Sequence, residues 1–190
     1  TGSVMPSGVK KELAAKVGNR IPDVVIRRGE LLDGVSLPDV VKDMGRNDVI
    51  LKGANAINYA ERLAALLIGH PTGGTVGAFM GAAISRRIRV ITPVGLEKEV
   101  PADLLEAASI AADPDEAPKA SPGLWVFPTE LFTEVEAFAL LTDVAAIPVA
   151  AGGIAGAEGS VRFLLTGDEE DIEEALALVE EIAGEPPFVS

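Results

Sequence analysis

The most informative run of the chain is Asp48-Val49-Ile50-Leu51-Lys52-Gly53-Ala54-Asn55-Ala56-Ile57-Asn58. Its apolar part, Val49 to Leu51, is short and continuous, which is typical of a strand buried on both faces of a parallel sheet. The small residues that follow Lys52 allow another backbone or a ligand to approach closely. We therefore predict a parallel strand that ends beside a ligand-binding edge of the sheet.

A second run, Gly69-His70-Pro71-Thr72-Gly73-Gly74-Thr75-Val76-Gly77-Ala78, places glycines around threonines and leads into an apolar segment that reaches Ile84. A glycine-rich loop that opens a helix presents free N–H groups and a positive dipole end to an anion. The same glycines also suit a plain turn and close helix packing, because a short glycine motif is a weak signal. The sequence leaves both interpretations open.

Strands and helices alternate around these two runs. Strands are expected at residues 21–26, 48–51 and 88–93, and helices at residues 37–42 and 76–84. Residues 59–68 are expected to be helical or irregular. The alternation predicts βαβ units, a parallel sheet and an α/β fold, and we assign residues 1–100 to a parallel α/β ligand-binding domain.

The pattern changes after Pro101, where residues 101–121 read as a helix and a linker. The segment 122–190 then shows strands at 124–127, 145–151 and 160–166, with helices at 129–141 and after Asp168. This β-α-β-β-α order is that of a ferredoxin-like α+β module. The last helix is expected to bury a stripe formed by Ile172, Leu176, Val179 and Ile182, with Asp171 as capping-box partner of Asp168.

Composition narrows the possible functions. The chain has 190 residues, no cysteine and one histidine, which excludes disulfides and thiol catalysis and argues against a metal centre or a bound cofactor. Its apolar runs are shorter than the roughly 18 residues of a membrane span, and we see no leader. We expect a cytoplasmic protein without a membrane partner. The net charge of −13 argues against nucleic acid as a partner.

Charge is distributed unevenly along the chain. Most Lys and Arg residues lie within residues 1–100, whereas carboxylates crowd into residues 99–190. The asymmetry predicts a neutral or positive cleft in the first part of the chain, suited to a small anionic metabolite. A solvated acidic helix near the C-terminus explains the same asymmetry equally well.

The candidate ligand-binding residues all lie in loops expected at the carboxyl edge of the sheet. They are Thr1, Gly2, Ser3, Lys52, Gly53, Asn55, Asn58, Thr72, Gly73, Gly74 and Thr75. Lys52 offers a charge to a phosphate or carboxylate, and the amides and hydroxyls offer directional contacts. The alternatives are a snorkelling Lys52, asparagines that serve turns, and a structural His70. Of Arg27 and Arg28, which point to opposite sides, one at most is expected to clamp an anion.

These runs, together with Thr1-Gly2-Ser3 and Arg89-Val90-Ile91-Thr92-Pro93, resemble the NagB/RpiA/CoA-transferase-like fold group. The run at residues 48–58 is similar to the second ligand loop of the sugar-phosphate sensor domains of DeoR-type repressors. The resemblance covers about residues 1–98. It implies an open α/β domain that takes a phosphorylated sugar or an acyl-CoA, and several members carry a small ferredoxin-like module.

The chain departs from the enzymes of this group at the reacting positions. One member of the group is ribose-5-phosphate isomerase, which carries carboxylates and a lysine in these loops. At the equivalent places this chain has Asn55, Asn58 and the run His70-Pro71-Thr72. An amide cannot serve as a general base near neutral pH. The nearest counterpart to the glutamate nucleophile of the CoA transferases is Glu97.

Three functions remain open from the sequence. The first is a domain that binds or senses a small anionic metabolite without chemistry of its own. The second is an enzyme that acts on a sugar phosphate or acyl-CoA through Lys52, His70 or Glu97. The third is an assembly subunit whose ferredoxin-like part pairs with copies of itself, and we expect a homo-oligomer in any case.

Overall fold

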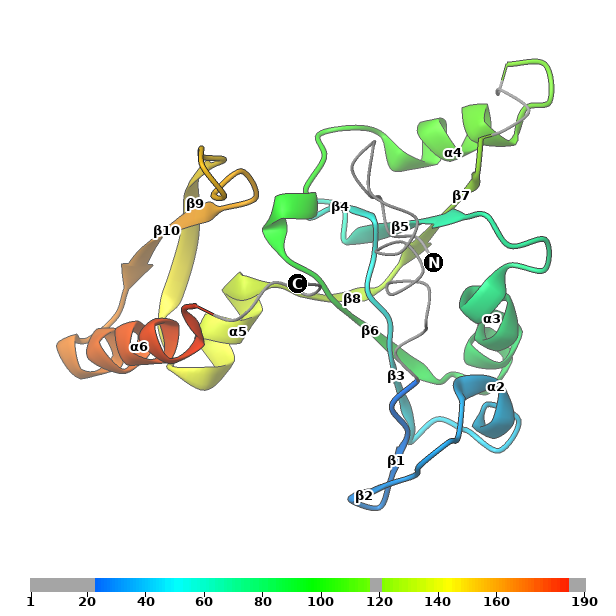
Figure 1. The fold of residues 1–190 in the computed structure, drawn as a ribbon, viewed down its shortest axis with the longest axis horizontal. Coiled ribbons are helices and arrows are strands. Elements are labelled where there is room, and N and C mark those ends of the chain that lie inside the picture. The colour runs from blue at the N-terminus through cyan, green and yellow to red at the C-terminus, as the bar shows by residue number, and fades with distance from the viewer. Residues whose placement is uncertain (1–22, 117–120, 185–190) are drawn as a thin grey trace.

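The computed structural model describes residues 23–116 and 121–184 of the chain (Figure 1). The elements follow in the order β1 (Ile26–Arg27), β2 (Glu30–Leu31), α2 (Leu37–Val40), β3 (Val49–Leu51), β4 (Ala56–Asn58), β5 (Leu63–Ile68), α3 (Gly74–Arg86), β6 (Arg89–Pro93), the 3₁₀ helix η1 (Leu96–Lys98), α4 (Leu104–Ala112), β7 (Gly123–Pro128), β8 (Glu130–Phe132), α5 (Glu134–Leu141), β9 (Ala145–Ala151), β10 (Val161–Thr166) and α6 (Glu169–Ile182). Helices and strands mix along the chain and one sheet is parallel, so the expected α/β class is confirmed.

The parallel sheet has the strand order β3-β6-β8. It contains the strands that the sequence predicts near residues 48–51 and 88–93. Ile50 of β3 lies beside Val90 of β6, and Thr92 of β6 lies beside Leu131 of β8. Because all three strands run in the same direction, the segments that leave their carboxyl ends meet at one edge of the sheet.

A second sheet is antiparallel, with the order β4-β5-β7. Its central strand β5 corrects the expectation that residues 59–68 are helical or irregular. Residues 63–68 form a continuous apolar run, and periodicity alone cannot tell such a run from a buried helix. These residues form a strand because they pair with β4 on one side and with β7 on the other.

The two three-stranded sheets and α3 share one hydrophobic core. Ile50, Ile57 and Leu131 from different strands are buried in it, together with Val76 and Phe79 of α3. The end of α3 is tied to the segment after α2, because the Arg86 guanidinium donates to the carbonyl oxygens of Val41, Lys42 and Met44. The short helix α2 is therefore fixed at the side of the parallel sheet.

The strand pairing of residues 122–184 differs from the expected ferredoxin-like order. Strand β7 pairs with β5 and strand β8 pairs with β6, so both belong to the sheets of the first part of the chain. Residues 130–132, expected within a helix, form β8, and α5 begins only after Thr133, whose side chain caps it. Strands β9 and β10 pair with each other as a two-stranded antiparallel sheet.

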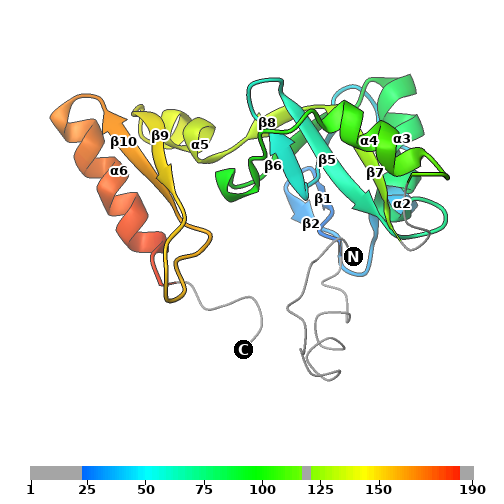
Figure 2. The same cartoon turned by 90° about the horizontal axis from the view of Figure 1, so that it is seen from above.

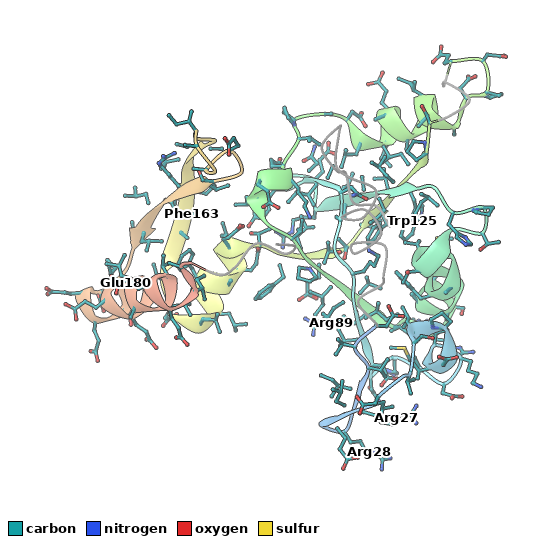
Figure 3. The ribbon with its side chains drawn as sticks, viewed as in Figure 1. Arg27, Arg28, Arg89, Trp125, Phe163 and Glu180 are labelled. Atoms are coloured by element: carbon teal, nitrogen blue, oxygen red, sulfur yellow. The ribbon has the colours of Figure 1, made fainter. Side chains whose placement is uncertain are left out.

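Figures 1 and 2 show β9, β10 and α6 standing apart from the two larger sheets, with α5 beside them. Phe163 of β10 packs edge-to-face on Phe138 of α5, with ring centroids 5.8 Å apart. Phe163 therefore lies in this smaller unit, far from Trp125, which stacks on Phe127 in the larger one (Figure 3). Within the described residues, the smaller unit has its own helices and two strands.

Helix α6 begins after Asp168 as expected, but its side-chain interactions differ from the expectation. Asp168 makes no side-chain cap hydrogen bond, so the capping box with Asp171 does not form. Ala175 is fully buried, whereas Leu176 is 52% exposed and Ile182 is 56% exposed. A sheet of two strands is too narrow to cover the whole apolar stripe of the helix.

The strand expected at residues 21–26 is described only from residue 23 onward. Residues 23–25 are irregular, and Ile26 and Arg27 form β1, which pairs with β2 in a two-stranded hairpin. In the part of the chain that the structure describes, no helix has both the length and the apolar character needed to cross a membrane.

Candidate functional site

Lys52 directly follows strand β3 and therefore lies at the carboxyl edge of the parallel sheet. Ile50 is buried in the core, and the backbone N–H of Lys52 donates to the carbonyl of Ile91 at 3.0 Å. This bond continues the parallel ladder for one more residue, so the Lys52 backbone is held as firmly as the strand. Gly53, where the chain then turns away, packs near the carbonyl oxygen of Pro93.

A cleft of about 1050 Å³ lies beside this strand end. Its walls come from the segment around β1, from α2 and the residues after it, and from β3, and Thr75 of α3 also contributes. Figure 1 shows where these elements lie in the fold. Three of the candidate residues therefore line one cleft, namely Lys52, Gly53 and Thr75. They come from two segments that are distant in sequence, the end of β3 and the first turn of α3. The apolar side chains of the lining include Leu37, Val40, Met44, Val49 and Leu51.

The charges of the cleft are balanced. Its cations are Arg27, Arg28 and Lys52, and its carboxylates are Asp23, Asp43 and Asp48. Two of the carboxylates accept backbone hydrogen bonds. Asp23 accepts from Leu37 N at 2.9 Å and Asp48 from Gly45 N at 2.7 Å. The lining is neutral by formal charge in a chain whose net charge is −13.

Figure 3 shows Arg27 and Arg28 at the tip of the β1–β2 hairpin. Arg28 has a left-handed backbone conformation, with φ of 54°, as part of the turn that joins the two strands. Both side chains are exposed, so each has room to reorient toward a ligand.

Lys52 is the half-buried cation of the cleft. Its Nζ donates to the carbonyl of Gly53 at 3.2 Å. Burial lowers the pKa of the Lys52 ammonium, the nearby charge of Lys98 lowers it further, and the carboxylate of Asp23 acts in the opposite direction. Among the described residues, the ion pairs are Arg62–Glu136 and Arg89–Glu130, and Lys52 takes part in neither.

The glycines of the second run have structural roles. Gly73 precedes α3 with φ of +80°, and a Cβ on Gly77 would lie 2.0 Å from the carbonyl oxygen of Thr72. Glycine is required at both positions, the first for its backbone conformation and the second for close approach. Of Thr72, Gly73, Gly74 and Thr75, only Thr75 lines the cleft. His70 is also engaged, because its Nδ1 lies 3.0 Å from the Thr72 hydroxyl.

The two asparagines of the first run serve neighbouring backbone. Asn55 Oδ1 accepts from Leu67 N at 3.0 Å, and its own N–H donates to Ala65 O. Asn58 Oδ1 accepts from Glu61 N at 3.1 Å, and its amide nitrogen lies 3.4 Å from Ala102 O. Neither residue lines the cleft. Thr1, Gly2 and Ser3 lie outside the described residues.

The sequence interpretation did not single out Asp23 and Lys98, the two groups that act on the charge of Lys52. Asp23 lies before β1, and Lys98 ends the 3₁₀ helix that follows β6. Lys98 carries a usable signal, because it follows a neighbouring parallel strand and so returns to the same edge of the sheet. Within residues 23–116 and 121–184, no group of three or more His, Cys, Asp or Glu side chains is placed to hold a metal ion.

Comparisons with known proteins do not add to this geometry. No protein-family model, no curated protein and no solved structure matches the chain.

Proposed function

We propose that the protein binds a small anionic metabolite, such as a phosphorylated sugar, in the cleft beside the end of β3. The observation that carries the proposal is the position of Lys52. It is a half-buried cation on the wall of a cleft of about 1050 Å³, outside both ion pairs of the described residues. A buried charge without an ion-pair partner is costly, and an anionic ligand would offset that cost.

Other features of the cleft support the same ligand class. Arg27 and Arg28 add two cations, and Thr75 contributes a hydroxyl at the first turn of α3, where the helix dipole is positive. The apolar part of the lining suits the carbon skeleton of a metabolite. The resemblance of residues 48–58 to a ligand loop of sugar-phosphate sensor domains agrees with this interpretation. A cytoplasmic location is part of the proposal.

The experiment is a thermal-shift screen of sugar phosphates, each paired with its unphosphorylated sugar, followed by calorimetry on the hits. A ligand that binds only the native state raises the apparent stability. The Lys52→Ala variant is expected to lose about 1.5–3 kcal/mol of binding free energy, the value of a charge-assisted hydrogen bond. The exposed Lys42, which lies outside the cleft, provides the matched control variant Lys42→Ala.

Two outcomes would contradict the proposal. One is equal stabilisation by the phosphorylated and unphosphorylated members of every pair. The other is an equal loss of affinity in the Lys52→Ala and Lys42→Ala variants, since only Lys52 lines the cleft.

A homo-oligomer is a separate part of the proposal, and the smaller unit supports it. Ile147 of β9 and Leu164 of β10 are cross-strand partners and so share one face of the two-stranded sheet. The opposite face, which carries Phe163, packs on Phe138 of α5. More than half of each of Ile147 and Leu164 is exposed. A second copy of the chain that packs on this face would bury both side chains.

A further inference from the structure

The surroundings of Lys52 differ from those of an ordinary surface lysine such as Lys42. Lys52 lines the cleft, whereas the exposed Lys42 does not, and Lys98 stands beside it as a second positive charge. Among the described residues, the acceptor that its Nζ contacts is the carbonyl of Gly53. The nearby carboxylate of Asp23 acts on it electrostatically but stays outside ion-pair distance.

The position of Lys52 on the wall of the cleft also suits a nucleophilic amine. Burial and the neighbouring Lys98 favour the neutral amine, whose lone pair is the nucleophile, and Asp23 acts in the opposite direction. The cleft does not depend on Lys52 alone for positive charge, because Arg27 and Arg28 also line it and Lys98 lies close by. Arg27 and Arg28, whose exposed side chains line the cleft, can contact the phosphate of a ligand while Lys52 reacts with its carbonyl.

We propose that the Lys52 side chain forms an imine with the aldehyde or ketone carbonyl of a phosphorylated ligand in the cleft. This inference rests on the proposed binding function and deepens it. The lone pair of Nζ attacks the carbonyl carbon and forms the N–C bond. Two protons from the nitrogen pass to the former carbonyl oxygen, which leaves as water. Hydrolysis of the C=N bond reverses the step, so no oxidant or reductant is required.

Two neighbours of Lys52 have distinct roles in this step. Lys98 lowers the proton affinity of the free amine and so raises the fraction that reacts. Asp23 favours the positively charged form and would stabilise the protonated imine. The other charged groups around the cleft are Arg27 and Arg28 at the β1–β2 turn, Asp43 after α2 and Asp48 before β3. A protonated imine withdraws electrons from the adjacent carbon, as in enzymes that use a lysine Schiff base.

The experiment traps the imine by reduction. The full chain is incubated near neutral pH with glyceraldehyde 3-phosphate and sodium cyanoborohydride, which reduces the imine to a stable secondary amine. Peptide mass spectrometry then compares labelling at Lys52 with labelling at Lys42, the internal reference. We expect several-fold faster labelling at Lys52. Glycerol 3-phosphate, which lacks the carbonyl, is expected to compete with the labelling.

Two variants keep the test specific. Lys52→Arg retains the charge but cannot form the imine, so the label at this position disappears while labelling of Lys42 is unchanged. Lys98→Met removes the neighbouring charge and is expected to slow labelling of Lys52 relative to Lys42. Far-UV circular dichroism of each variant against the parent recognises a variant that is unfolded.

The outcomes separate this inference from the proposed function. If glycerol 3-phosphate binds and protects Lys52 against general amine reagents but Lys52 is labelled no faster than Lys42, the imine is excluded and anion binding stands. If Lys52 is trapped equally fast by glyceraldehyde 3-phosphate and by unphosphorylated glyceraldehyde, the reactive amine stands and anion recognition is wrong. If neither ligand affects Lys52, both are overturned.

Discussion

At the scale of single residues, Glu136 is the carboxylate with the most interactions among the described residues. It accepts hydrogen bonds from Tyr59 Oη at 2.8 Å, from Arg62 at 2.9 Å and from Thr133 N at 2.8 Å. Burial opposes its ionisation, but the hydrogen bonds from Thr133, Arg62 and Tyr59 outweigh burial and lower its pKa to about 2. In its anionic form, Glu136 therefore links α5 to the turn before β5 through these hydrogen bonds.

Its lowered pKa fixes the sign of a pH dependence. The pKa of the Glu136 carboxyl is near its ordinary value of 4.5 in the unfolded chain and is about 2 in the folded chain. The stabilisation is complete above the unfolded value and is lost as pH falls through this window. Glu136→Gln is expected to lower the free energy of unfolding by about 1–2 kcal/mol at neutral pH, a range reduced for solvent screening of the half-exposed Arg62.

Urea denaturation of the parent and of Glu136→Gln, at neutral pH and at acid pH within that window, measures this difference. We expect the difference in free energy of unfolding between the parent and Glu136→Gln to become smaller at acid pH. Glu130→Gln is the control, because the Arg89–Glu130 pair is more exposed and should have the smaller effect. A gap that stays constant with pH would mean that the charge of Glu136 does not contribute.

At the scale of elements, α3 contains two glycines whose surroundings are opposite. A Cβ on Gly77 would clash with the backbone carbonyl of Thr72 at 2.0 Å, whereas a Cβ on Gly81 would have no neighbour within 4 Å. Alanine is favoured over glycine in a helix by about 1 kcal/mol. Gly81→Ala should therefore stabilise the protein, and Gly77→Ala should destabilise it, because the backbone carbonyl cannot move aside as a flexible side chain would.

The midpoints of urea unfolding for the two variants test this contrast directly. Gly81→Ala serves as the control for helix propensity within the same helix. If Gly77→Ala were as stable as Gly81→Ala, the close contact between the start of α3 and the loop before it would be wrong. Calorimetry with a confirmed ligand should also show weaker binding to Gly77→Ala, because Thr75 is carried by the displaced turn.

The same elements show what the sequence could predict. The parallel strands at residues 48–51 and 88–93 are predicted from local apolar runs. The start of α3 is predicted from the glycines that precede its apolar segment. Strand β5 was missed because a six-residue apolar run carries no period, and β8 because three residues are too few to interrupt a helical pattern. The pairing of β7 with β5 is a contact between distant segments, which local patterns do not encode.

The candidate site was predictable to a similar degree. Lys52, Gly53 and Thr75, which line the cleft, could be expected to lie near one another because residues after a strand and at a helix start gather at a sheet edge. Asn55 and Asn58 look the same in sequence whether they serve a ligand or a neighbouring backbone, and their hydrogen bonds to Leu67 N and Glu61 N appear only in three dimensions. The influence of Asp23 and Lys98 on Lys52 likewise depends on the fold.

At the scale of the whole molecule, the smaller unit seen at one end in Figure 2 contains a sheet of two strands within residues 121–184. A two-stranded sheet is marginal in water, and three or more strands are normally needed for stability. Among the described residues, strands β9 and β10 pair with each other and with no further strand. On one face of this sheet Ile147 is 51% exposed and Leu164 is 54% exposed. Apolar pairs of this kind are typical of a surface that another chain covers.

We therefore expect the protein to self-associate through this face. Light scattering at micromolar concentration should give a mass that is a multiple of 19.6 kDa for the parent. Ile147→Ser with Leu164→Ser should shift the mass toward the monomer, because two apolar side chains are lost from each copy. Leu105→Ser removes an equally exposed side chain from α4, in the larger unit, and should leave the mass unchanged. A parent mass near 19.6 kDa would show that the exposed face serves something other than a second copy.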